Sequence, residues 1–130
     1  MKKASIPAIL LFCLATISIS FGQGPFQQVK PTAQDQVRLT KLERAYKAAK
    51  SALAKAPNSA KAKKDFTTIG AAYGHESMVS PVLTPRVKYP QALHIYREVL
   101  KVDPNQKTAK SESELIISIY KQMGRPVPQG

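Results

Sequence analysis

The feature that most constrains how this chain can fold is an internal repeat with a 47-residue period. When the sequence is shifted by that distance, residues 45–77 align with residues 92–124 without a gap. Each copy has the pattern of a helix, a Pro-Asn corner and a second helix. Two copies of this pattern are typical of stacked helical hairpins. The repeat therefore predicts an all-α fold of antiparallel helix pairs. The identical residue pairs are Ala45/Ala92, Leu53/Leu100, Pro57-Asn58/Pro104-Asn105, Ala62-Lys63/Ala109-Lys110, Ile69/Ile116 and Tyr73/Tyr120.

The spacing of apolar side chains predicts four helices, over about 32–56, 59–78, 90–102 and 108–123, in a domain that spans residues 32–124. Pro57 and Pro104 follow the first and third helices, because a residue before proline is pushed out of the helical region. Gly124 is a favoured residue just past the end of the fourth helix. Residues 23–31 are predicted as an irregular lead-in and residues 125–130 as an extended tail.

The segment between the second and third predicted helices contains three prolines, at positions 81, 85 and 90. They predict a Pro-rich loop over residues 79–90, with Pro90 at the first position of the third helix. So long a loop is unusual in a compact domain and is often functional. Its apolar residues, including Val82 and Leu83, leave two alternatives: a flap that folds back over the helices, or a loop that binds a partner.

Two stretches of the repeat resemble helices of the tetratricopeptide repeat (TPR) family. Phe66-x-x-Ile69-Gly70-x-x-Tyr73 is similar to that family's first helix, and Ala92-x-x-x-Tyr96-x-x-Val99-Leu100-x-x-x-Pro104 is similar to its second helix. The second-helix pattern recurs at Ala45, Leu53 and Pro57, and the first-helix pattern recurs at Ile116, Tyr120 and Gly124. The chain departs from the family at Ser113 (normally aromatic) and Ile117 (normally glycine), and its period exceeds the usual one of about 34 residues.

The resemblance implies a protein–protein interaction module, a curved stack whose inner surface is formed by the first helices and binds a segment of a partner. Polar and mildly basic side chains on that surface favour an extended peptide over an apolar helix. Because about three repeats are needed to bury a continuous core, the short array also predicts a partner or self-association at its edge. The implied partner-binding positions are Lys64, Thr67, Thr68, Ala71, His75, Ser111, Glu114, Ser118, Lys121 and Gln122, together with Gly74 and Leu115.

Residues 1–22 have the pattern of a signal peptide. Lys2 and Lys3 precede an apolar run over residues 8–17, and Ser20 and Gly22 are small residues where a signal peptidase cleaves. We expect cleavage after Gly22, with cleavage after Ser20 as the alternative; retention as an anchor is left open. The run is shorter than the about 20 apolar residues of a spanning helix, so no stable membrane insertion is expected after cleavage. The predicted location is the periplasm or the exterior of a bacterial cell.

Cys13 is the single cysteine and allows a second interpretation of this segment. Leu10-Leu11-Phe12-Cys13 resembles a bacterial lipobox, but a lipobox has a small residue where Phe12 stands, and the apolar run continues past Cys13. We therefore interpret Cys13 as an ordinary apolar residue of the signal peptide. The exported domain would then contain no cysteine and would be held together by packing alone.

The sequence contains few residue patterns that are typical of an enzyme. It contains no Gly-rich phosphate loop, no nucleophile elbow and no zinc-protease motif. His75-Glu76, with His94 as the only other histidine, is the candidate set for metal or acid–base chemistry. No third ligand stands at a metal-like spacing, and the scattered carboxylates lie mostly beside lysines that would pair with them. We predict a protein without enzymatic activity, metal or cofactor.

The charge distribution supports an alternative function. Residues 30–64 carry a net charge of +8, whereas residues 65–130 carry +2. This asymmetry favours a basic adaptor that binds an acidic envelope surface or a polyanion through its Lys- and Arg-rich first helix. Export argues against nucleic acid as the partner. The apolar face of that helix is mostly alanine without Trp or Phe, which suits helix packing better than insertion into lipid.

Overall fold

The computed structural model describes residues 29–129, which fold into four α-helices. These are α1 (Ala33–Lys55), α2 (Ala60–Val79), α3 (Pro85–Val102) and α4 (Lys107–Gln122). The predicted all-α fold is confirmed for this part of the chain, and α1, α2 and α4 begin and end within one residue of the predicted bounds. The predicted signal peptide, both cleavage positions, Cys13 and residues 23–28 of the lead-in lie outside the described residues.

Local side chains explain where the helices begin. The Thr32 hydroxyl accepts a hydrogen bond from the N–H of Asp35, and the Asp35 carboxylate accepts one from the N–H of Thr32, so a capping box starts α1. The bonds from Thr32 hold the pKa of Asp35 below its ordinary value. Ser59 and Gln106 start α2 and α4 by accepting bonds from backbone N–H groups three residues further on.

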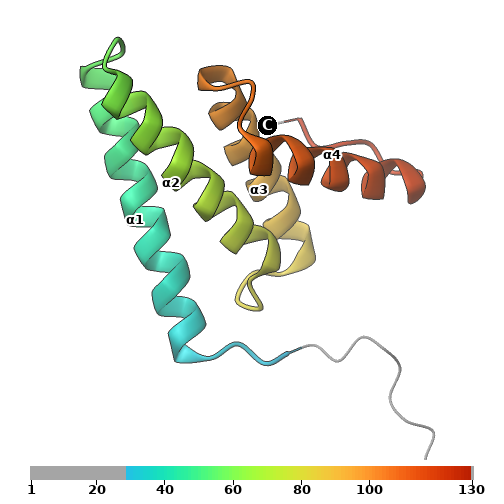
Figure 1. Ribbon diagram of the computed structural model, residues 1–130. Coiled ribbons are helices and arrows are strands. Elements are labelled where there is room, and N and C mark those ends of the chain that lie inside the picture. The colour runs from blue at the N-terminus through green and yellow to red at the C-terminus, as the bar shows by residue number, and fades with distance from the viewer. Residues whose placement is uncertain (1–28, 130) are drawn as a thin grey trace, which may run out of the picture.

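Consecutive helices pack as neighbours. α1 lies along α2, and α2 lies along α3, whereas α4 runs across their direction and contacts both α3 and α2 (Figure 1). α2 is therefore packed by three helices. α2 and α4 are the two helices that carry the first-helix pattern, and they are in contact although α4 runs across α2.

Aromatic side chains fill the space between the helices. Tyr46 of α1 stacks on Phe66 of α2 with ring centroids 5.6 Å apart and lies against Tyr73 at 5.3 Å. Tyr96 of α3 is completely buried. The other buried apolar residues are Leu39, Ala49, Ala71, Ala92, Leu93, Ile95, Val99, Ala109 and Ile116.

The residues that define the repeat occupy matching places in this core. Phe66, Tyr73, Ala92 and Tyr96 are buried. Half-buried around them are Ala45, Leu53, Ile69, Leu100 and Tyr120. Pro57 and Pro104 are exposed at the corners, and Gly124 ends the last helix with a φ of 62°, a backbone conformation that favours glycine.

The third helix begins earlier than predicted. α3 starts at Pro85 and not at Pro90, so the connection covers residues 80–84 and the predicted loop over residues 79–90 is wrong. Pro85 suits the first helical position, and the Thr84 carbonyl accepts bonds from the N–H groups of Val87 and Lys88. Pro90 lies inside the helix, where it forgoes one backbone hydrogen bond.

Packing explains why this early start is stable. Val82 and Leu83 of the connection and Tyr89 of α3 pack against the core. Ser80 is completely buried, and its hydroxyl accepts a hydrogen bond from the N–H of Val82 at 3.2 Å. The connection therefore has the geometry of the flap, the first of the two alternatives drawn from the sequence.

Candidate functional site

The predicted partner-binding residues lie on α2 and α4, two helices that contact each other, and we call their exposed and half-buried positions the α2/α4 face. Most of them are accessible: Lys64, Thr68 and His75 on α2 are exposed, as are Ser111, Glu114, Lys121 and Gln122 on α4, while Ser118 is half-buried. Leu115, also on α4, is 49% exposed. The structure thus brings eight of the ten predicted positions to the surface of two adjacent helices.

Two of the predicted positions do not belong to this face. Thr67 and Ala71 are 7% and 4% exposed, so the expectation that they contact a partner is wrong. The physical reason is that α2 is packed by α1, α3 and α4, which leaves it only a narrow free surface. The Thr67 hydroxyl donates to the Lys64 carbonyl of its own helix at 3.1 Å. Gly74 is buried as well.

Glycine allows α2 and α3 to approach closely. A Cβ on Gly70 would stand 2.5 Å from Cγ2 of Val99. A Cβ on Gly74 would stand within 3 Å of three ring atoms of Tyr96. The role of Gly70 agrees with the repeat pattern, but Gly74 also serves packing and is not a partner-binding position.

One carboxylate joins three helices beneath the α2/α4 face. Glu112 of α4 accepts a hydrogen bond from the hydroxyl of Tyr96 on α3, and its other oxygen lies 2.8 Å from Nδ1 of His75 on α2. Burial, and then the bond to Glu112, raise the pKa of the Tyr96 hydroxyl. Glu112 was expected to pair with lysines, and no pattern in the sequence points to this role. The bridge adds a polar contact between α2 and α4.

A second carboxylate joins α1 to α3. Glu98 accepts a hydrogen bond from the Tyr46 hydroxyl and forms an ion pair with Lys50 at 2.5 Å. Burial acts to raise the pKa of Glu98, but the bonds from Lys50 and Tyr46 outweigh burial and hold this pKa below its ordinary value. Burial and Glu98 also raise the pKa of Tyr46.

The candidate catalytic set does not converge. His75 faces α4, Glu76 is buried and accepts a hydrogen bond from Nε of Arg38 on α1 at 2.9 Å, and His94 lies 3.8 Å from a carboxylate of its own helix. Each of the three therefore has a different partner. Within residues 29–129, no group of three or more His, Cys, Asp and Glu side chains is placed to hold a metal ion.

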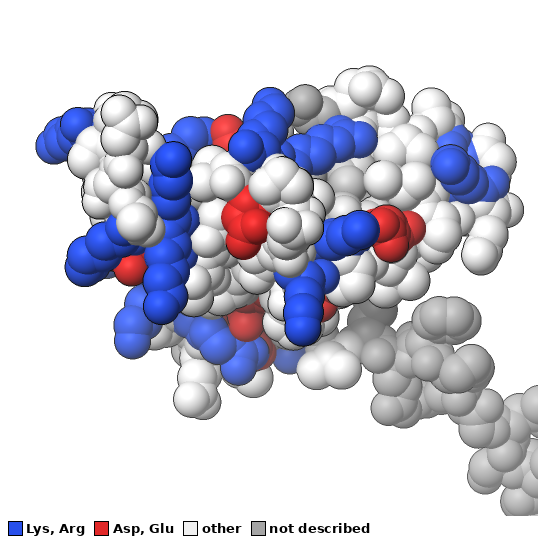
Figure 2. Space-filling model, turned by 45° about the horizontal axis from the view of Figure 1, so that its top comes forward, with Lys and Arg blue, Asp and Glu red and all other residues white. Residues whose placement is uncertain are grey.

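The outer side of α1 is a cationic stripe. Six exposed residues recur there at steps of three and four, which places them on one face of the helix: Val37, Lys41, Arg44, Ala48, Ser51 and Lys55. Among the described residues, Lys41, Arg44 and Lys55 form no ion pair, whereas Lys47 pairs with Glu43 at 2.6 Å. Figure 2 shows Lys and Arg spread over the displayed face, with several of them at its left edge.

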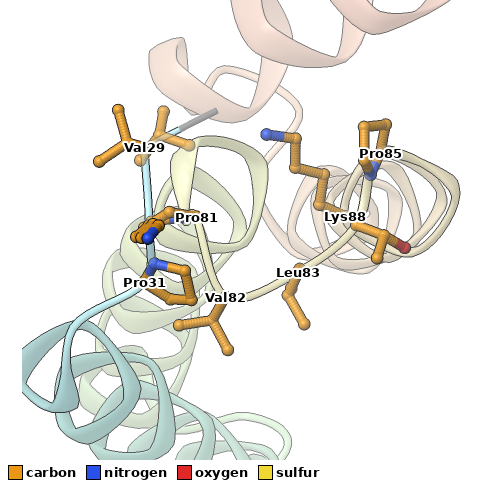
Figure 3. A pocket seen from close by; sticks show the side chains of 10 residues that line it. Val29, Pro31, Pro81, Val82, Leu83, Pro85 and Lys88 are labelled. Atoms are coloured by element: carbon orange, nitrogen blue, oxygen red, sulfur yellow. The ribbon is translucent and has the colours of Figure 1, made fainter. Parts of the chain in front are cut away.

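An apolar hollow of about 540 Å³ lies between the chain before α1 and the connection before α3 (Figure 3). Val29 and Pro31 form one wall, and Pro81, Val82 and Leu83 form another. None of the predicted partner-binding residues lines it.

Comparisons with models of known protein families, with curated proteins and with solved structures found no match to this chain. The resemblance to the TPR family therefore stays a prediction. None of the helices in residues 29–129 combines the length and the apolar character needed to cross a membrane.

Proposed function

We propose that this chain is a non-catalytic protein–protein interaction module of an exported, TPR-like protein, and that it binds an extended segment of a partner on the α2/α4 face. The observation that supports the proposal is the contact between α2 and α4, which together carry eight polar positions implied by the resemblance that are exposed or half-buried. The Glu112 bridge supports it, because bonds from one carboxylate to α2 and α3 favour a preorganised surface.

The chemistry of the α2/α4 face indicates the kind of partner. Hydroxyl groups of Thr68 and Ser111 offer hydrogen bonds, and the ammonium groups of Lys64 and Lys121 favour carbonyl and carboxylate acceptors. Leu115 adds one exposed apolar side chain. An extended segment with acidic groups has the acceptors that such a surface can satisfy.

The test uses the full chain as bait in an envelope extract and then measures the binding of the recovered partner to designed variants. Thr68→Glu with Ser111→Glu adds two negative charges to the α2/α4 face. Ala48→Glu with Ser51→Glu adds the same two charges to the exposed side of α1 and serves as the matched control. We expect the first pair to weaken binding at least tenfold and the second pair to leave it within about twofold, since surface changes away from the contact have small effects.

A second candidate function is the basic adaptor, and the observation that favours it is the cationic stripe of α1. In the same experiment this function predicts the reverse result, with binding lost in the α1 pair and kept in the α2/α4 pair. It also predicts a steep fall of affinity with salt, because polyanion binding releases counterions. If neither pair changes binding, both functions are wrong.

A further inference from the structure

The hollow between the chain before α1 and the connection before α3 has a strongly apolar lining. Seven of its ten lining residues are valine, leucine or proline, and none of the ten is acidic. Two of the seven are among the large hydrophobic side chains most exposed in the described part of the chain, Val29 at 72% and Val79 at 49%. Within residues 29–129, the walls therefore leave apolar surface open to solvent.

The walls of this hollow are held in place by the fold itself. Val82 and Leu83 pack against the core, and the buried Ser80 hydroxyl accepts a hydrogen bond from the N–H of Val82. The three prolines of the lining have a fixed backbone φ. A preformed site loses little freedom when a ligand binds. The volume of about 540 Å³ lies within the range of about 300–1,000 Å³ that is typical of small-molecule sites.

The polar side chains of the lining are two lysines and one threonine. Neither Lys30 nor Lys88 forms an ion pair with a carboxylate of the described residues. Nζ of Lys88 lies 5.4 Å from the centroid of the Tyr89 ring, and Figure 3 shows this side chain extending from α3 toward the other lining residues. The Thr84 hydroxyl makes no hydrogen bond to the start of α3. The hollow thus offers two ammonium groups and one hydroxyl to an anion.

This lining selects for one class of ligand. A sugar or a peptide would bring many hydroxyl or N–H groups against walls whose only uncharged polar side chain is that of Thr84, and unpaired polar groups are costly to bury. A cation would face two like charges. An aliphatic chain that ends in one carboxylate matches both the walls and the two ammonium groups.

We propose that this hollow binds a medium-chain alkanoate. The alkyl chain lies against Val79, Val82 and Leu83, and the carboxylate pairs with the ammonium groups of Lys30 and Lys88. The site is separate from the α2/α4 face and does not rest on the function proposed above.

The test is an NMR titration of the full chain with hexanoate, octanoate and decanoate. The backbone amide signals of Val79, Val82 and Leu83 should shift and reach saturation. Affinity should rise about two- to fourfold for each added methylene, because each one buries further apolar surface. Decyltrimethylammonium has a chain of the same length and the opposite charge, and it should bind about tenfold more weakly than decanoate.

Two pairs of variants locate the site. Val79→Asp places a negative charge in the hollow and should weaken decanoate binding about tenfold or more. Val87→Asp is its matched control, since Val87 is 48% exposed and does not line the hollow, and it should leave binding within about twofold. Lys88→Gln should weaken binding about threefold, whereas Lys41→Gln removes the same charge from α1 and should not. Far-UV circular dichroism confirms that the variants keep their helices.

The proposal is overturned if the signals do not saturate, if decanoate and decyltrimethylammonium bind equally, or if Val79→Asp and Val87→Asp have the same effect. Phosphatidylcholine vesicles with and without phosphatidylglycerol separate a free alkanoate from a lipid surface. Binding to the anionic vesicles that depends on Val79, without binding of decanoate, would assign the hollow to a membrane. A dimer that Val79→Asp abolishes would assign it to a second copy, and decanoate binding only in Phe26→Ala would assign it to the chain's own preceding segment. Each of these three results would likewise overturn the proposal.

Discussion

Replacing Gly74 by alanine is the sharpest test of how α2 and α3 pack. The new Cβ would stand 2.8 Å from Cδ1 and 2.9 Å from Cζ of Tyr96, closer than real Cβ atoms approach their neighbours. The ring cannot swing away, because it is completely buried and its hydroxyl is bonded to Glu112. The two helices must therefore separate, or Tyr96 must lose its place in the core.

The size of the effect follows from two opposing contributions. Overpacking a core costs about 1–3 kcal/mol, and a ring fixed at both ends places Gly74→Ala in the upper part of that range. Alanine in a helix interior is favoured over glycine by about 1 kcal/mol. We expect a net loss of about 1–2 kcal/mol in the free energy of unfolding, and a fall of about 5–15 °C in the midpoint of thermal unfolding for a domain of this size.

Urea and thermal unfolding, followed by far-UV circular dichroism, measure this loss. Ala72→Gly, at an exposed position of the same helix, calibrates the helix-propensity contribution and should cost about 1 kcal/mol. In a Tyr96→Leu background, which removes the ring, Gly74→Ala should cost less than in the wild type. The packing described for α2 and α3 is refuted if Gly74→Ala stabilises the protein by the amount that propensity alone predicts.

Three further substitutions and one control test other parts of the fold. Arg38→Ala leaves the buried Glu76 carboxylate without its partner and should lower the free energy of unfolding by about 1–3 kcal/mol, whereas Lys47→Ala, at an exposed ion pair, should change it by less than about 0.5 kcal/mol. The folded-state pKa of Glu98 lies below its ordinary value, so its stabilising contribution is complete above that ordinary value, 4.5, and is lost as the pH falls through the lowered pKa. Urea unfolding from pH 7 down to pH 3 should therefore show a smaller acid loss in Glu98→Gln than in the wild type. Thr32→Ala removes the capping box of α1 and should cost about 1 kcal/mol in the same assay.

The helix bounds could be predicted from the sequence where local chemistry sets them. Thr32 and Ser59 begin their helices with side-chain bonds that need only the next three residues. Pro57 and Pro104 follow helix ends for equally local reasons. The start of α3 was missed because Pro90 is a strong local signal against a helix, and only contacts with residues distant in the sequence outweigh it.

Eight of the positions implied by the resemblance are exposed or half-buried on α2 and α4, because the spacing of a helix decides which side chains share a side. Thr67 and Ala71 were misplaced because their burial depends on how three other helices surround α2, and spacing within one helix does not contain that information. The bonds of Glu112 to His75 and Tyr96 were missed for the same reason. The contact of Arg97 with Pro128 joins residues 31 positions apart and has no local signal at all.

The cationic stripe of α1 also affects how copies of the molecule can assemble. A stack of helical hairpins is open at its ends, and head-to-tail addition of further copies does not close, so it produces filaments. α1 forms one such end, and an incoming copy with the same positive charge would be repelled there. Screening at physiological ionic strength acts over about 8 Å, close to the spacing of packed helices, so the repulsion is felt at the distance where a new hairpin would settle. Like charge thus opposes the approach of a second copy at that end.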